Sequence, residues 1–168
     1  VAEPSPRDSM AAIGLAAAIL ENRHGPVLVA SFAADHVVPE IAGFHEALRQ
    51  AVVAARAGYV TTIGITPTHP STAFGYIRKG AALGADAGGP AAHAVMEFVE
   101  KPDAETAAGY LRAGDVSWNA GMFVVRTDVL LAHLTRLQPP LAAGLREIAA
   151  AWDTPSRADT LDRAWPTL

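Results

Sequence analysis

The chain has no cysteine, no excess of positive charge and no long apolar run, and each absence excludes a class of function. Without cysteine, disulfides, thiolate metal sites and cysteine nucleophiles are excluded. The net charge of −4 argues against nucleic-acid binding, which needs a basic surface. The longest apolar run, from Met10 to Leu20, is too short to span a bilayer and lacks the layout of a secretory signal. We therefore expect a cytoplasmic protein without a membrane anchor.

The length and composition fit one globular domain. A chain of 168 residues can bury roughly 70% of the surface that its unfolded form exposes. Hydrophobic residues make up 51% of the sequence and charged residues 18%, a balance typical of globular proteins. The sequence starts at Val1 and stops at Leu168 in an apolar phrase, so we expect both ends to be truncated. Neither an internal repeat nor a second domain is evident.

Apolar periodicity predicts strands and helices that alternate along the chain. Short apolar or β-branched runs predict strands over 27–32, 59–65, 94–99 and 119–126. Helical spacing predicts helices over 10–22, 39–57, 103–112, 128–136 and 141–152. The alternation predicts an α/β fold with a mixed, mainly parallel sheet and helices on both faces. The Ala- and Gly-rich stretch 80–92 is expected to form a mobile loop.

Three predicted strands are followed by polar groups. Asp35 follows the first strand, Thr66 the second, and Glu100 with Lys101 the third. Ligands of open α/β sheets bind beyond the carboxyl ends of the strands, so these groups predict a binding site at one edge of the sheet. Pro102 restricts Lys101 to extended geometry, so we expect the strand end to be held rigidly. A strand end with two solvated charges is the alternative interpretation.

Five short motifs occur in one order along the chain. They are Glu-Pro-Ser-Pro-Arg-Asp-Ser-Met-Ala-Ala-Ile at 3–13, Ala-Asp-His-Val-Val at 34–38, Gly-Ile-Thr-Pro at 64–67 with Thr-Ala-Phe-Gly-Tyr-Ile at 72–77, Phe-Val-Glu-Lys-Pro at 98–102, and Trp-Asn-Ala-Gly-Met-Phe at 118–123. The set resembles the bacterial mannose-1-phosphate guanylyltransferases, a branch of the nucleotidyltransferases that make nucleotide sugars. One such pentamer would be weak evidence, whereas five in order are specific.

The resemblance implies a Rossmann-like fold of the nucleotide-diphospho-sugar transferase type and a defined reaction. GMP would pass from GTP to mannose 1-phosphate, which releases pyrophosphate and forms GDP-mannose. The sugar phosphate would attack the α-phosphorus without a covalent enzyme intermediate, so positioning and charge neutralisation would supply the catalysis. Magnesium is the expected cofactor, and neither nucleic acid nor a membrane is an expected partner. Assembly as a homodimer is left open.

The resemblance implies catalytic roles for two residues. Asp35 would bind Mg²⁺, which prefers oxygen ligands and takes one or two carboxylates beside substrate phosphates. A loop aspartate that bonds its own backbone is the alternative. Lys101 would bind the sugar phosphate, because an ammonium on a flexible stem acts as a point charge toward phosphate.

Other positions would bind the substrates. Glu100 can accept from two sugar hydroxyls, and Asn119 can donate to or accept from another. Gly75, next to Tyr76, lets the backbone approach the sugar closely. An Asx-type bond for Asn119 and an ordinary turn for Gly75 are the alternatives. Glu3 is the expected guanine reader, because a carboxylate can accept from the two adjacent N–H donors of the guanine Watson–Crick edge.

Three more candidate substrate-binding residues follow Glu3. Arg7 either pairs with a phosphate or braces its loop, and the sequence does not separate these roles. Asp8 stands where the family has asparagine, and Ser9 where it has threonine. Both retain hydrogen-bonding ability, but Asp8 adds negative charge near a triphosphate. Nucleotide preference is the property that this departure affects most.

Two elements of the family are absent from the sequence: a glycine-rich N-terminal loop and a C-terminal strand with a second metal-binding aspartate. Residues 1–168 are therefore expected to form the central part of a single catalytic domain and to be inactive alone. Three alternatives remain. They are a nucleotidyltransferase for another sugar 1-phosphate or base, a catalytically inactive sugar-nucleotide-binding module, and polar groups that are only solvated loop tips.

Overall fold

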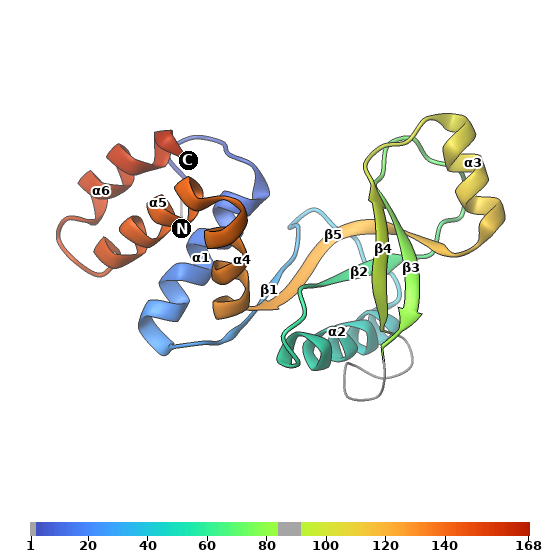
Figure 1. The fold of residues 1–168 in the computed structure, drawn as a ribbon, viewed down its shortest axis with the longest axis horizontal. Helices are drawn as coiled ribbons and strands as arrows, with labels where there is room; N and C mark the ends of the chain where they lie inside the picture. Colours follow the sequence, from blue (N-terminus) through green and yellow to red (C-terminus); the bar gives the residue numbers. More distant parts are fainter. Residues whose placement is uncertain (1–2, 84–91) are drawn as a thin grey trace. The chain divides into compact units, whose positions relative to one another are not determined.

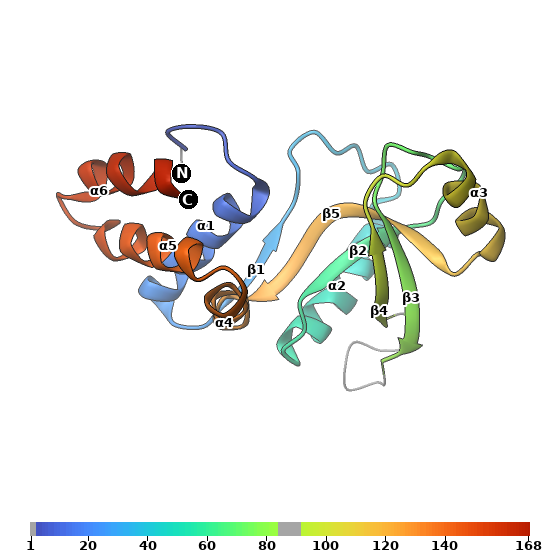
Figure 2. The same cartoon turned by 45° about the horizontal axis from the view of Figure 1, so that its top comes forward.

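The fold is that of a computed structural model, which describes residues 3–83 and 92–168. These residues group into two compact units, each with a hydrophobic core of its own. The first unit contains the described residues up to Val29 together with Val125–Leu168, and the second contains those of Ala30–Val124. Figure 1 and Figure 2 show the elements from two directions.

The first unit is built from helices. They are α1 (Ser9–His24), α4 (Thr127–Leu137), α5 (Pro139–Ala151), α6 (Arg157–Ala164) and the 3-10 helix η2 (Trp165–Thr167). Leu15, Leu145, Ile148 and Trp165 are almost fully buried and form the centre of the core. Gly14 allows α1 to lie close to α5, because a Cβ at this position would be 2.6 Å from Leu145 Cδ1. Burial of these apolar side chains is the main source of this unit's stability.

The second unit combines a sheet with two helices. Its elements are α2 (Ile41–Arg56), β2 (Thr61–Ile65), β3 (Tyr76–Ala82), β4 (His93–Val99) and α3 (Ala104–Ala113). β1 (Leu28–Ser31) and β5 (Val116–Arg126) continue from one unit into the other. The sheet has five strands in the order β1-β5-β3-β4, and β2 also pairs with β5. Tyr76, Ala107, Val116 and Trp118 form the buried core on one face of this sheet.

The mixed α/β class is confirmed, but the expected mainly parallel pairing was wrong for three strand pairs. β2 with β5, β3 with β4, and β3 with β5 all pair antiparallel. β3 and β4 are joined by residues 83–92, fewer than the dozen or more that a parallel crossover requires. β3 has no counterpart among the predicted strands, because its Arg-Lys-Gly-Ala-Ala portion lacks the β-branched residues that indicate a strand.

The other predicted strands and all five predicted helices are present, with small shifts of their ends. α6 and η2, like β3, have no predicted counterpart. Of the predicted mobile loop at 80–92, residues 80–82 belong to β3 and residues 84–91 lie outside the described residues. None of the described helices has the length and apolar character needed to cross a membrane.

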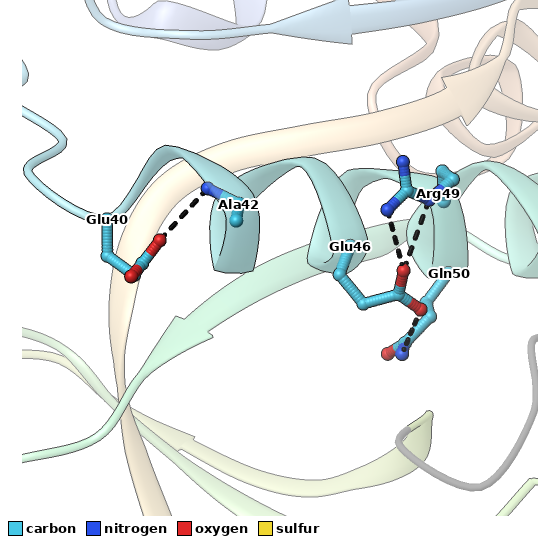
Figure 3. A network of polar contacts seen from close by, with 5 residues as sticks. All are labelled: Glu40, Ala42, Glu46, Arg49 and Gln50. Atoms are coloured by element: carbon cyan, nitrogen blue, oxygen red, sulfur yellow. Dashed lines mark hydrogen bonds and ion pairs between the residues drawn. The ribbon is translucent and has the colours of Figure 1, made fainter.

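α2 begins at a carboxylate cap and carries a network of polar contacts farther along the helix (Figure 3). Glu40 accepts a hydrogen bond from the backbone N–H of Ala42 at 3.0 Å. Farther along, Glu46 accepts from Arg49 Nη2 at 2.9 Å and from Gln50 Nε2 at 3.0 Å. The bonds from Arg49 and then Gln50 hold the pKa of Glu46 below its ordinary value. Because the network is exposed, it orients side chains and adds little stability.

α3 begins at a second carboxylate cap. Asp103 accepts from the backbone N–H of Thr106 at 2.8 Å, and this bond is the main reason why the pKa of Asp103 lies below its ordinary 3.8. Because the folded-state pKa is lower than the unfolded one, the cap contributes fully above the unfolded pKa. Its contribution is lost as the pH falls through the folded-state pKa.

We expect Asp103→Ala to lower the Tm at neutral pH, and the difference from wild type to shrink as the pH falls below about 4. Asp103→Asn is the matched control, since asparagine caps helices about as well but does not titrate. It should keep most of the neutral-pH Tm. Thermal melts over a pH series measure both effects, and an unchanged Tm for Asp103→Ala at neutral pH would contradict the cap.

Candidate functional site

The candidate residues lie in both units. Glu3, Arg7, Asp8 and Ser9 belong to the first unit and the other six to the second. Those six are Asp35, Gly75, Tyr76, Glu100, Lys101 and Asn119. Each group makes the contacts given below within its own unit.

Four residues of the second unit meet at the ends of two strands and within a third. Gly75 precedes β3, Glu100 and Lys101 follow β4, and Asn119 lies in β5. The backbone N–H of Asn119 donates to the carbonyl of Gly75 at 2.7 Å. A Cβ on Gly75 would lie 2.6 Å from Glu100 Oε2, so the carboxylate occupies the space that a side chain would fill. We call Gly75, Glu100, Lys101 and Asn119 the polar cluster.

Asn119 is oriented by two hydrogen bonds to its side-chain carbonyl. Oδ1 accepts from Thr62 Oγ1 at 3.0 Å and from the backbone N–H of Gly121 at 3.1 Å. The second bond is the Asx-type contact that was the alternative to a binding role. Both bonds use Oδ1, and neither uses the Nδ2 amide, which can donate to a further acceptor.

Glu100 and Lys101 form an exposed acid–base pair. Their side chains are 59% and 64% exposed, and Glu100 Oε1 lies 3.8 Å from Lys101 Nζ. The expected extended geometry of Lys101 was wrong: its φ is 46°, in the left-handed region. Lys101 lies in the bend after β4, so the chain reverses here instead of continuing as a strand. A lysine in this backbone conformation is strained, because its Cβ crowds the following carbonyl.

Tyr76 adjoins the polar cluster through Gly75, but its side chain is buried. The residue is 1% exposed, and the hydroxyl is bonded to both backbone groups of Ser71. A substrate contact from Tyr76 would therefore have to come from its backbone.

Asp35 and the candidates of the first unit are exposed. Asp35 lies in the turn that follows β1. Asp8 stands at the N-cap of α1 without a side-chain capping bond, and Ser9 is the first residue of that helix. Arg7 Nη2 donates to the carbonyl of Pro166, which supports the bracing role for this arginine. Glu3 is exposed near the start of the described chain.

Sequence reasoning missed Thr62, which orients Asn119. Thr62 also lines a cleft of about 640 Å³ within the second unit, together with Gly64, Ile77 and Ser117. The cleft therefore reaches the residue that holds the polar cluster's amide. Thr62 belongs to none of the recognisable motifs, so only its position opposite β5 could reveal its role.

Comparison with known proteins identifies relatives that are longer than this chain. Residues 1–166 match the family described as nucleotidyl transferase. "Xanthan biosynthesis protein XanB" of Xanthomonas campestris pv. campestris (strain B100) is 40% identical over 151 residues, which are 90% of this chain and 30% of that protein. "Mannose-1-phosphate guanylyltransferase RfbM" of Salmonella typhimurium is 41% identical over 143 residues, which are 84% of this chain and 29% of that protein. The chain thus spans about a third or less of these relatives' length.

Two solved structures share the fold. A protein of Thermus thermophilus, described as a mannose-1-phosphate geranyltransferase, is 29% identical with a TM-score of 0.84, and the match covers 100% of this chain and 46% of that one. A mannose-6-phosphate isomerase of Helicobacter pylori is 26% identical with a TM-score of 0.73, and the match covers 89% of this chain and 53% of that one. Since the family match extends over nearly every residue, this chain belongs to the nucleotidyl transferase family.

Proposed function

We propose that this protein transfers GMP from GTP to mannose 1-phosphate, giving GDP-mannose and pyrophosphate. The observation that carries the proposal is the polar cluster: the Glu100 carboxylate lies against the buried Gly75, the Lys101 ammonium lies beside that carboxylate, and Asn119 is bonded through its backbone to Gly75. This set suits a ligand that has both hydroxyls and a phosphate. Relatives named mannose-1-phosphate guanylyltransferase, matched over most of this chain, support the same substrates.

The three polar side chains of the cluster each have a proposed role in binding mannose 1-phosphate. Glu100 accepts from sugar hydroxyls through an exposed carboxylate. The Nδ2 amide of Asn119 donates to another hydroxyl, since its Oδ1 is already bonded. Lys101 binds the phosphate, and its exposed ammonium retains the reach that this role needs.

The proposed reaction is an in-line displacement at the α-phosphorus of GTP that transfers a nucleotidyl group. An oxygen of the sugar phosphate forms a bond to the α-phosphorus of GTP, the bond from that phosphorus to the β-phosphate oxygen breaks, and pyrophosphate leaves. Two anions must approach one another, so repulsion contributes to the barrier. Lys101 reduces this repulsion by placing a positive charge beside the attacking phosphate.

Asp35 is the proposed protein ligand of a divalent metal, and Mg²⁺ is the metal that fits. Among residues 3–83 and 92–168, no group of three or more His, Cys, Asp or Glu side chains could hold a metal. A single exposed carboxylate suits Mg²⁺, which completes its coordination with water and substrate phosphates. When bound, the ion would supply positive charge at the phosphates.

The first unit is the proposed source of nucleotide contacts. Glu3 is exposed, so its carboxylate can accept from the two N–H donors of guanine. Asp8 and Ser9 stand at the start of α1, where backbone N–H groups favour phosphate oxygens. We also propose that residues 1–168 belong to one catalytic domain and that the protein is cytoplasmic, with assembly as a homodimer left open.

Ligand-dependent melting tests the proposed substrates. A ligand that binds only the folded chain raises its Tm with ligand concentration. We expect GDP-mannose to raise the Tm more than GDP-glucose or ADP-glucose at the same concentration. A larger shift with another nucleotide sugar would favour a different nucleotidyltransferase, and no shift with any of them would leave the polar groups as solvated loop tips. In a protein that carries the whole catalytic domain, magnesium-dependent release of pyrophosphate from GTP and mannose 1-phosphate separates an active enzyme from an inactive binding module.

A further inference from the structure

The Tyr76 side chain is among the most buried of the second unit, and its hydroxyl both accepts and donates a hydrogen bond. The backbone N–H of Ser71 donates to the Tyr76 hydroxyl at 2.9 Å. The same hydroxyl donates to the carbonyl of Ser71 at 3.0 Å. Both backbone groups of one loop residue are thus satisfied by a single side chain, and both partners are buried.

Ser71 lies in the segment 66–75, which joins β2 to β3 and which we call the β2–β3 loop. The loop has further contacts that fix its path. Ser71 Oγ accepts from the backbone N–H of Ala73 at 3.1 Å. The rings of His69 and Phe74 pack on Trp118, with centroids 5.0 and 4.9 Å away. The loop ends at Gly75, the member of the polar cluster that Glu100 approaches.

The position of Tyr76 in the sheet relates this bond to the polar cluster. Tyr76 lies opposite Val99 of β4 and opposite Trp118 of β5. These two partners directly precede Glu100 and Asn119 in the sequence. Because successive residues of a strand point to opposite faces, Trp118 and Asn119 lie on opposite faces of β5. Trp118 and Tyr76, which pairs with it, thus form a buried aromatic layer on the face opposite the Asn119 side chain. The Tyr76 ring also packs on Tyr110 of α3, with centroids 5.4 Å apart.

We infer that Tyr76 is a positioning residue for the sugar subsite: its hydroxyl fixes the β2–β3 loop, and the loop in turn fixes the spacing between Gly75, Glu100 and Asn119. This inference rests on the proposed function, because the polar cluster is taken to bind the sugar. The ring of Tyr76 contributes buried apolar contacts, whereas its hydroxyl holds the β2–β3 loop through the bonds to Ser71. The two roles can therefore be separated by removing the hydroxyl alone.

Tyr76→Phe is the test variant, since it keeps the ring contacts with Tyr110 and Trp118. Tyr110→Phe is the matched control, because it removes a phenol hydroxyl from the neighbouring ring. Calorimetric titration with GDP-mannose and with GDP gives two dissociation constants for each protein. We expect Tyr76→Phe to weaken GDP-mannose binding about fivefold, because the loss of one hydrogen bond of ordinary strength has an effect of this size. GDP binding should be unchanged. Tyr110→Phe should leave both constants unchanged.

Hydrogen exchange supplies a readout that does not depend on ligand. In Tyr76→Phe, the amide of Ser71 loses its acceptor and should exchange about tenfold faster or more, whereas the amides of α2 should keep their protection. Unchanged exchange at residue 71 would overturn the inference. So would equal weakening of GDP and GDP-mannose, which would indicate a general loss of structure. A wild-type protein that binds neither ligand would overturn the proposed function itself, whereas wild-type binding that Tyr76→Phe leaves intact would overturn only the role of Tyr76.

Discussion

Lys101→Gln is expected to lower kcat/KM for mannose 1-phosphate by about 100-fold, which is the size of effect seen when one preorganised charged or dipolar group is removed from a developing anion. The reason is that glutamine retains much of the reach of lysine but not its charge, so the attacking phosphate loses its cation. Steady-state kinetics with GTP at saturation, on a protein that carries the whole catalytic domain, measures the change. A loss of less than about threefold would remove Lys101 from the reaction.

Two further variants separate the charge of Lys101 from net charge and from backbone strain. Arg112→Gln removes one positive charge from the exposed surface of α3 and should leave kcat/KM unchanged, which controls for net charge. Lys101→Gly removes the charge and also the left-handed strain at φ 46°. We expect it to be as inactive as Lys101→Gln but to melt at a higher temperature than that variant. Such a combination would mean that the strained backbone is retained for catalysis and not for folding.

Gly75→Ala is expected to weaken GDP-mannose binding by about 30-fold while changing the Tm little. The new Cβ would lie 2.6 Å from Glu100 Oε2 and 3.2 Å from Phe98 Cζ, both at the ends of side chains that can move. The fold can therefore accommodate the methyl group, but only by displacing the Glu100 carboxylate from its place. Loss of a hydrogen bond to a charged group costs about 2 kcal/mol, which corresponds to about 30-fold in affinity.

Gly109→Ala is the matched control for Gly75→Ala. A Cβ at Gly109, inside α3, would meet only the end of the Arg112 side chain at 3.9 Å. This variant should raise the Tm, because alanine favours a helix more than glycine does, and it should leave binding unchanged. Calorimetric titration with GDP-mannose and thermal melts on wild type, Gly75→Ala and Gly109→Ala test both predictions. If Gly75→Ala bound GDP-mannose as tightly as wild type, Glu100 would not be a sugar ligand.

The longer amphipathic helices could be predicted because their apolar spacing is regular. In α2, for example, Ala51, Ala54 and Ala55 are buried on one face, and Gly58 follows the end of the helix. The polar cluster could be predicted only from the order of the motifs. Gly75, Glu100 and Asn119 are distant in the sequence, and no spacing rule brings them together. Their contact depends on the antiparallel register of β3 between β4 and β5.

Local rules failed where tertiary contacts decide the conformation. The residue before a proline usually prefers extended geometry, but Lys101 adopts a left-handed conformation because the chain must turn after β4. Tyr76 belongs to a motif that suggests contact with a ligand, whereas its hydroxyl is taken by Ser71, a residue whose position cannot be read from the motif. α6 is only 8 residues long and has few apolar residues, so the sequence gives a weak helix signal for it.

The aromatic layer behind the polar cluster gives this protein an intrinsic optical probe. The sequence has three tryptophans, and Trp118 is the one that lies in the second unit. It directly precedes Asn119 and packs against Phe74, the neighbour of Gly75. Indole emission is sensitive to the packing and polarity around the ring. With Trp152 and Trp165 replaced by phenylalanine, the indole fluorescence of the whole molecule would come from a single buried ring adjacent to the polar cluster, so occupancy could be followed without a label.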